Sequence, residues 1–209
     1  MPLLCIVNFS SETIEKAVEQ LSRFPGIGKK TALRMTLFLL KDKTDSVERM
    51  AQAMVDLKTK VVYCKTCGNV SEKEICGICS SVNRNKKMIC VVKDFQDIIS
   101  IENTGQFPGV YHVLGGVIAP MDGIGPDDLR INELLQRVDE DAVEELVFAL
   151  SANMEGDTTA FYISRKLEGK NVRISAIARG IAVGGELEYA DEITLGRSIL
   201  NRVPYQTSM

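Results

Sequence analysis

Four cysteines with regular spacing are the residues of this sequence best suited to chemistry. They form two Cys-x-x-Cys pairs with eight residues between them: Cys64, Cys67, Cys76 and Cys79. Each pair can supply two thiolates from one tight turn, and two such turns complete a tetrahedral zinc site. Because the protein then fills all four positions, no position remains for a substrate water, so we expect one structural zinc ion per chain. Gly68 and Gly77 each follow a cysteine and fit turns that fold back around a metal.

Four unrelated thiols or two disulfides are the alternatives to a zinc site. Residues 1–7 contain no basic stretch and no small-residue cleavage site, so we expect no signal peptide and a cytoplasmic location. Thiols stay reduced in that compartment, which favours metal ligation over disulfides. Cys90 has no partner at metal-ligand spacing and lies in an apolar run, so we expect it to be buried.

A glycine turn between two helical segments is the second candidate site. Apolar residues recur at helical spacing at Ile14, Val18 and Leu21 and again at Leu33, Leu37 and Leu40, with Phe24-Pro25-Gly26-Ile27-Gly28 between them. The free N–H groups of the second helix and of the glycines could hold a phosphate. This turn resembles the helix-hairpin-helix motif, which binds the DNA backbone without reading sequence. The candidate DNA contacts are Gly26, Gly28, Lys29, Lys30 and Arg34.

This turn has two other interpretations. An ordinary helical hairpin with solvated lysines is the simpler one. A P-loop is excluded because Arg23 stands where the first glycine is needed, Lys30 stands where Ser or Thr is needed, and no strand precedes the turn.

The charge distribution supports the DNA interpretation. The chain has 209 residues and a net charge of −3, which hides two opposite halves. Residues 1–20 carry net −2. Residues 21–93 carry fifteen Lys and Arg against six Asp and Glu, net +9, whereas residues 94–209 carry nine against nineteen, net −10. A basic front is a candidate for nucleic acid and an acidic back for other partners. With 45% hydrophobic residues and no long apolar run free of polar residues, the composition excludes a disordered or membrane-spanning protein.

The elements that must position these residues fall into two classes. Residues 11–60 are expected to be helical, with Asp45 capping the last helix. From residue 88 onward apolar strands alternate with helical segments. The expected strands are 88–92, 110–114, 145–150 and 172–175, and the expected helices are 94–101, 127–138 and 158–167. This alternation predicts an α/β domain with a mostly parallel sheet.

Three stretches of this α/β region resemble a Toprim domain, the fold of topoisomerase and primase catalytic cores. They are Val91 to Asp94, Tyr111 to Gly116 and Glu155 to Ala160. Active Toprim enzymes bind magnesium through a glutamate after the first strand and an Asp-x-Asp turn after a later one. Here Lys93 stands at the glutamate position and Glu155-x-Asp157 replaces the aspartate pair. A cation opposes divalent metal binding, so we expect no phosphoryl chemistry. The only histidine, His112, is expected to be structural.

The order of motifs along the chain resembles one family, the bacterial recombination mediator RecR family. A helix-hairpin-helix, a four-cysteine knuckle and a Toprim region are followed by an acidic stretch, Gly184 to Glu192, of the kind called Walker B-like. We therefore expect an α+β multidomain fold. Its expected domains are a helical DNA-binding module (1–60), a zinc knuckle (61–82), a Toprim-like α/β domain (83–175) and a C-terminal stretch with a helix (176–209).

The resemblance also implies a function. RecR-like proteins form ring-shaped tetramers that encircle DNA, act with RecO and RecF, and help to load recombinase onto single-stranded DNA at gaps; they are not known as enzymes. Lys30 and Arg34 would contact DNA phosphates, and Glu155 and Asp157 would dock a protein partner. The apolar segment 193–200 is a candidate subunit interface. A magnesium-dependent Toprim nuclease or primase-like enzyme and a zinc adaptor that binds only protein are the alternatives.

Overall fold

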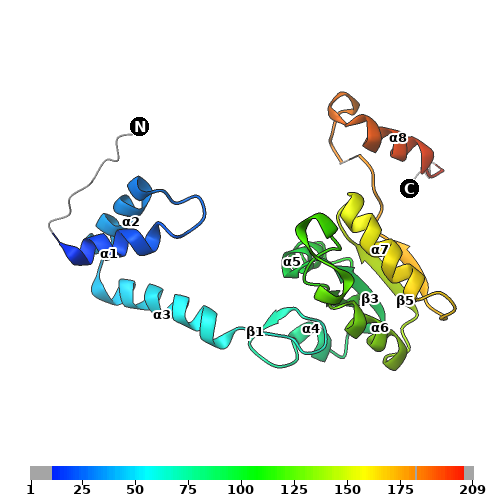
Figure 1. The fold of residues 1–209 in the computed structure, drawn as a ribbon, viewed down its shortest axis with the longest axis horizontal. Helices are drawn as coiled ribbons and strands as arrows, with labels where there is room; N and C mark the ends of the chain where they lie inside the picture. The colour runs from blue at the N-terminus through cyan, green and yellow to red at the C-terminus, as the bar shows by residue number, and fades with distance from the viewer. Residues whose placement is uncertain (1–10, 182, 205–209) are drawn as a thin grey trace. The chain divides into compact units, whose positions relative to one another are not determined.

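The structure, a computed structural model, describes residues 11–181 and 183–204. The chain divides into two compact units, one ending at Lys60 and the other beginning at Val61 (Figure 1). The protein is an α+β multidomain protein, with a helical unit first and a unit that combines a four-cysteine knuckle with a parallel sheet second. None of the helices in the described part of the chain combines the length and the apolar character needed to cross a membrane.

The first unit consists of α1 (Glu12–Leu21), α2 (Lys29–Lys41) and α3 (Thr44–Lys60). Its core is small, with Val18 and Leu21 of α1 packed against Ala32 of α2. The helix expected from the spacing of Leu33, Leu37 and Leu40 is confirmed, but these leucines do not form its buried face. Leu33 is half-buried, but Leu37 and Leu40 are 41% and 67% exposed, because α2 turns its Ala32 and Thr36 face inward.

The third helix packs differently from the first two. α3 begins at Thr44, so Asp45 lies in its first turn rather than at its cap. No residue of α3 is buried, and Met54, Val55 and Leu57 are exposed. Within a single chain, the apolar side of this amphipathic helix therefore stays in contact with solvent.

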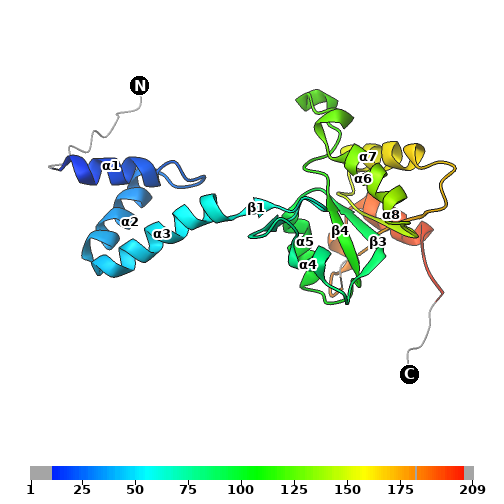
Figure 2. The ribbon, with the colours of Figure 1, turned by 90° about the horizontal axis from the view of Figure 1, so that it is seen from below.

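The second unit begins with the cysteine knuckle, shown in Figure 2 beside the sheet. A two-stranded antiparallel hairpin, β1 (Val62–Tyr63) and β2 (Val70–Ser71), is followed by the short helix α4 (Gly77–Ser80). The main sheet follows, with strands β3 (Asn85–Val92), β4 (Gly109–Val113), β5 (Glu145–Ala149) and β6 (Arg173–Ala176).

All neighbouring strands of the main sheet are parallel, in the order β4-β3-β5-β6. Alternate residues of β3 face opposite sides. Ile89 and Val91 pack against α6 (Ile131–Glu140) and α7 (Met154–Lys166), whereas Cys90 and Val92 pack against α5 (Phe95–Glu102). Strands buried on both faces read as continuous apolar runs, which is why residues 88–92 and 145–150 were recognisable as strands.

Two helices of this unit begin elsewhere than expected. The helix expected over 127–138 begins at Ile131, after the short 3-10 turns Pro120–Asp122 and Pro126–Asp128. The helix expected over 158–167 begins at Met154, because the side chain of Asn153 accepts a hydrogen bond from the Gly156 N–H (2.9 Å) and caps it. A Cβ on Gly156 would lie 2.1 Å from the carbonyl oxygen of Ser151, so this glycine allows close packing where sequence suggests a helix breaker.

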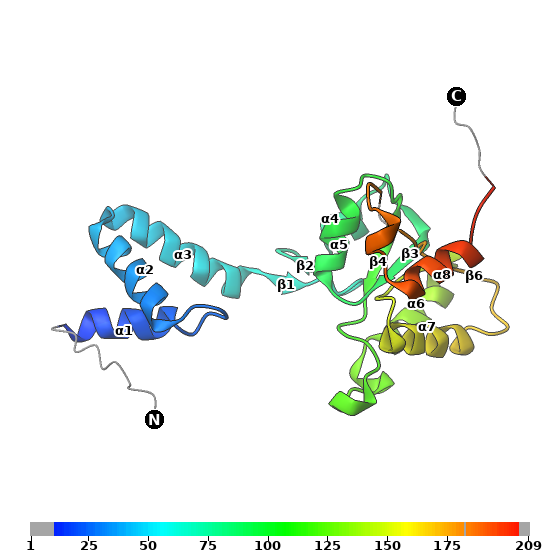
Figure 3. The same cartoon turned by 90° about the horizontal axis from the view of Figure 1, so that it is seen from above.

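The C-terminal segment leaves the sheet after β6. It contains a short 3-10 turn, Leu187–Tyr189, and the helix α8 (Glu192–Leu200), drawn in red in Figure 3. No residue of α8 is buried, and Ile193, Ile199 and Leu200 are largely exposed.

Candidate metal centre and nucleic-acid interface

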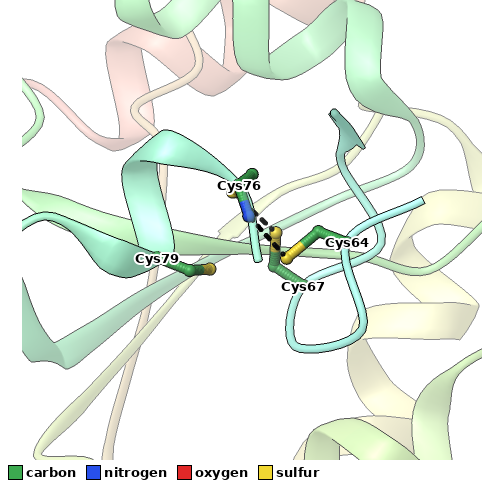
Figure 4. Close-up of side chains that lie close together, drawn as sticks. All are labelled: Cys64, Cys67, Cys76 and Cys79. Carbon is green, nitrogen blue, oxygen red and sulfur yellow. Dashed lines mark hydrogen bonds between the residues drawn. The ribbon is translucent and has the colours of Figure 1, made fainter. Parts of the chain in front are cut away.

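The four cysteines of the knuckle converge on one point (Figure 4). Cys64 and Cys67 come from the loop after β1, whereas Cys76 is the N-cap of α4 and Cys79 lies within that helix. Their sulfur atoms all lie within 4.8 Å of one another, and none of the four side chains is more than 8% exposed. The loop is shaped by its own backbone, since the Cys64 N–H donates to the Asn69 carbonyl (2.7 Å).

The electrostatics of this cluster call for a cation. Hydrogen bonds with Cys67 and Cys79 lower the pKa of the Cys76 thiol. The hydrogen bond between Cys67 and Cys76, whose sulfurs lie 3.6 Å apart, raises the pKa of Cys67. One thiolate is therefore stabilised by its neighbours, whereas further thiolates repel one another at this separation. A divalent ion removes that conflict, and four buried sulfurs at this spacing are the donor set that zinc prefers.

The two glycines of the knuckle differ in what they do. Gly68 has φ +76°, a conformation that favours glycine, and it closes the first cysteine turn. Gly77 begins α4 without a positive φ, and a Cβ there would meet nothing within 4 Å. The expectation that both glycines fold the chain around the metal was therefore wrong for Gly77, whose position any small residue could fill.

The glycine turn between α1 and α2 has a different character. Gly26 has φ +77°, and Gly28 precedes α2 as its N-cap. A Cβ built on either glycine would meet nothing within 4 Å, so both face open space. Gly28 has no side chain to accept a hydrogen bond from the first N–H groups of α2, which are left for an outside acceptor.

The basic residues of this turn are on the surface. Lys29, Lys30 and Arg34 are all exposed, and the structure gives none of them an ion pair with a described residue. Lys30 and Arg34 are four residues apart on α2 and therefore lie on one face of the helix. Exposed cations next to free helix N–H groups form a surface that suits a phosphate.

At the edge of the sheet that resembles a Toprim site, a lysine stands next to acids that contact other groups of the protein. Lys93 follows β3 directly and is exposed. The nearby acids have other roles: the Asp94 side chain caps α5, and the Asp97 carboxylate accepts the N–H groups of Lys93 and Asp94 at 3.1 Å. Over residues 11–181 and 183–204, the four cysteines are the only set of three or more His, Cys, Asp or Glu side chains that could hold a metal ion.

Glu155 and Asp157 lie in the first turn of α7 rather than in a loop. Glu155 is exposed, whereas Asp157 forms an ion pair with Arg179 at 2.7 Å. The hydrogen bond from Arg179 lowers the pKa of the Asp157 carboxyl group. Sequence spacing gave no sign of Arg179, because this partner comes from the segment after β6, 22 residues further along the chain.

His112 and Cys90 are both buried in the sheet. The Nε2 atom of His112 donates to the Arg130 carbonyl at 2.8 Å, and burial lowers the pKa of His112 to about 3, so the ring is neutral. Burial raises the pKa of the Cys90 thiol to about 12. Neither side chain is accessible for chemistry on a substrate, since both are at most 1% exposed.

Comparison with known proteins accounts for almost the whole chain. Residues 14–58 match the helix-hairpin-helix model of RecR, 61–81 its four-cysteine zinc finger, 87–178 the Toprim domain and 180–203 the RecR C-terminal model. The recombination protein RecR of Flavobacterium psychrophilum is 52% identical over 202 residues, which cover 97% of this chain and 98% of that protein. The chain belongs to the RecR family.

Two further relatives support the same family assignment. The RecR proteins of Porphyromonas gingivalis strain W83 and Bacteroides thetaiotaomicron are 52% identical over 204 residues and 55% identical over 194 residues. These alignments cover 98% and 93% of this chain, and 99% and 95% of the relatives. As a RecR family member the protein has a role in recombination and repair, and its buried cysteine cluster is the structural zinc site of the family's zinc finger.

Proposed function

We propose that this RecR family protein is a non-catalytic DNA-binding clamp that helps partner proteins load recombinase onto single-stranded DNA at gaps. The observation that carries the proposal is the exposed glycine turn before α2, where uncapped N–H groups begin the helix that carries the exposed cations of Lys29, Lys30 and Arg34. Such a surface binds phosphates through the backbone of DNA and carries no information about base sequence. Action on DNA in a bacterial cell places the protein in the cytoplasm, at the nucleoid.

The proposal that the chain is not an enzyme rests on the Toprim edge. A magnesium-dependent Toprim nuclease or primase needs carboxylates grouped around the metal, whereas Lys93 occupies one such position and Asp157 is neutralised by Arg179. A cleavage assay on gapped DNA with magnesium tests this point. Cleavage that is lost in Glu155→Gln would support the enzyme instead.

The proposed assembly is a homotetrameric ring. One helix-hairpin-helix with a few phosphate contacts binds DNA with Kd values of about 10⁻⁴–10⁻⁶ M, and several copies on a closed ring raise the avidity by roughly 10²–10⁴. Exposed apolar side chains on α3 and α8 are the candidate interfaces, among them Leu57 and Ile199. Truncation after Asp191 should give smaller assemblies by light scattering and much weaker DNA binding. A truncated protein that keeps its mass and affinity would exclude α8 as an interface.

The partners proposed are proteins of the RecO and RecF type, docked on the acidic Toprim surface that includes Glu155 and Asp157. Glu155 is free to meet a basic partner, whereas Asp157 would have to exchange its Arg179 contact for the partner. We expect Glu155→Lys to abolish complex formation in pull-downs with purified RecO and RecF from the same organism. Unchanged binding of both proteins would move the docking surface elsewhere.

DNA binding is tested by fluorescence anisotropy on two single-stranded DNAs of unrelated sequence. Lys30→Ala with Arg34→Ala should weaken binding to both DNAs equally. Arg49→Ala is the matched control, because Arg49 is an exposed arginine of the same unit that pairs with Asp45 (2.7 Å) and belongs to α3 rather than to the glycine turn or α2. If the double variant binds as well as the control, this turn is not the DNA-binding surface.

A further inference from the structure

Arg130, just before α6, reaches the zinc knuckle from outside the cysteine motif. Its Nη2 atom donates to the carbonyl oxygen of Lys65 at 3.4 Å, inside the first Cys-x-x-Cys turn. Its guanidinium also covers Gly68, since a Cβ built on that glycine would lie 1.9 Å from Nη1. These two contacts lie on either side of Cys67, one of the four sulfur ligands.

The arginine is itself held by the sheet and by α6. Its N–H donates to the Leu114 carbonyl at 3.0 Å, and its carbonyl accepts the Nε2–H of the fully buried His112 at 2.8 Å. Its side chain pairs with Glu133 at 3.3 Å and is 28% exposed. These contacts hold the arginine in one orientation, which lowers the conformational entropy lost when its guanidinium contacts the knuckle.

A third contact fixes the same turn. The N–H of Val113, at the end of β4, donates to the carbonyl of Cys67 at 2.7 Å. The backbone of the first cysteine turn is thus held at three points, the carbonyls of Lys65 and Cys67 and the Cα of Gly68, by groups from the Toprim part of the unit.

We propose that Arg130 is a positioning residue of the zinc site, holding the Cys64–Cys67 turn in the geometry that the metal requires. It acts through the backbone, since none of its contacts is with a sulfur atom. Groups beyond the ligands that fix ligand orientation are worth about 10–100-fold in metal affinity. The cation of Arg130 adds to this effect, because four thiolates and one Zn²⁺ leave a net charge of −2.

Metal affinity of the full chain tests this proposal without any DNA assay. Competition with a chelator, and titration with Co²⁺ followed by its thiolate absorption, report affinity and coordination geometry. Arg130→Ala should bind zinc about 10–100-fold more weakly and shift the cobalt spectrum. Arg165→Ala is the matched control, since Arg165 also pairs with a glutamate three residues further on, Glu168, but touches no part of the knuckle. Equal zinc affinity in the two variants would overturn the proposal.

A double-mutant cycle separates this contact from a general loss of structure. Gly68→Ala pushes a methyl group into the guanidinium and strains the backbone at φ +76°, and removing the guanidinium relieves only the clash. The loss of zinc affinity caused by Gly68→Ala should therefore be smaller in the Arg130→Ala background. Losses that multiply independently would contradict direct packing of Arg130 on the turn.

Arg130→Lys covers the case in which the alanine variant does not fold. Lysine keeps the positive charge but loses the planar group that lies over Gly68 and donates to the turn. Its zinc affinity should fall below that of the native chain. If this variant has the zinc affinity and the cobalt spectrum of the native chain, the contacts of the Arg130 guanidinium do not position the turn.

Discussion

The cysteine knuckle and the glycine turn before α2 are both short loops built around glycine, yet they use it in opposite ways. At Gly68 a Cβ would collide with Arg130, whereas at Gly26 and Gly28 it would meet nothing. The knuckle hides its four functional side chains, while the turn exposes Lys29, Lys30 and Arg34. Polar groups that are buried together need partners within the protein or a bound metal, whereas exposed side chains of the same charge are available to a ligand.

Removal of the metal should change stability more than any other treatment, and only in the unit that holds the knuckle. Because the zinc site has no apolar core of its own, metal binding energy is folding energy there, and apparent values for structural zinc reach about 10–16 kcal/mol. Cys79→Ser or an excess of chelator should lower the melting temperature of the second unit and leave α1 and α2 helical by circular dichroism. A melt unchanged by both treatments would contradict a structural zinc.

Replacing a glycine of each loop with alanine should have opposite effects on stability and on DNA binding. Gly68→Ala introduces a clash and a strained φ and should cost about 1–3 kcal/mol or more in the free energy of unfolding. Gly28→Ala, with φ −81° and open space around it, should change stability by less than about 1 kcal/mol. It should instead weaken DNA binding about fivefold, which corresponds to about 1 kcal/mol.

Urea unfolding and DNA anisotropy measure both quantities on the same preparations. The account requires stability to fall in one variant and affinity in the other. A Gly28→Ala protein that is strongly destabilised would mean that this turn, too, is packed inside the fold.

A smaller effect is expected from pH. Burial lowers the pKa of His112 to about 3, so its ring stays neutral in the folded state. In the unfolded chain the ring binds a proton below the ordinary histidine pKa of 6.5. The unfolded state then holds more protons, and stability decreases as pH falls, by about 1.4 kcal/mol between pH 7.5 and 5.5. Urea unfolding of His112→Gln, whose amide can still donate to Arg130, should show a flatter pH dependence. The same slope in both proteins would contradict a buried neutral histidine.

Local patterns in the sequence were enough to predict the cysteine cluster, the glycine turn and the four parallel strands. Cys-x-x-Cys spacing fixes which sulfurs can meet, and apolar runs identify strands that are buried on both faces. Local patterns do not show which face of a helix is buried, because a partner elsewhere in the chain decides it. Leu37 and Leu40 have the spacing of core residues but face solvent, because α1 packs against another face of α2.

Contacts between distant segments were beyond the reach of sequence patterns. Arg130 lies 65 residues from the carbonyl of Lys65 that it contacts, and Arg179 lies 22 residues from Asp157. Neither pair has a spacing tied to a helix or a strand, so only the fold brings them together. The early start of α7 has a local cause instead, because the Asn153 side chain caps the helix and Gly156 packs closely on the carbonyl of Ser151.

The dependence of DNA affinity on salt tests the central claim most directly. If Lys30 and Arg34 each neutralise a phosphate of single-stranded DNA, each alanine variant should flatten the slope of log K against log salt by roughly 0.7, and the double variant by about twice as much. The melting temperature should stay unchanged, because both side chains are exposed. Weaker binding with an unaltered slope would show that these residues act through folding, and would contradict the account.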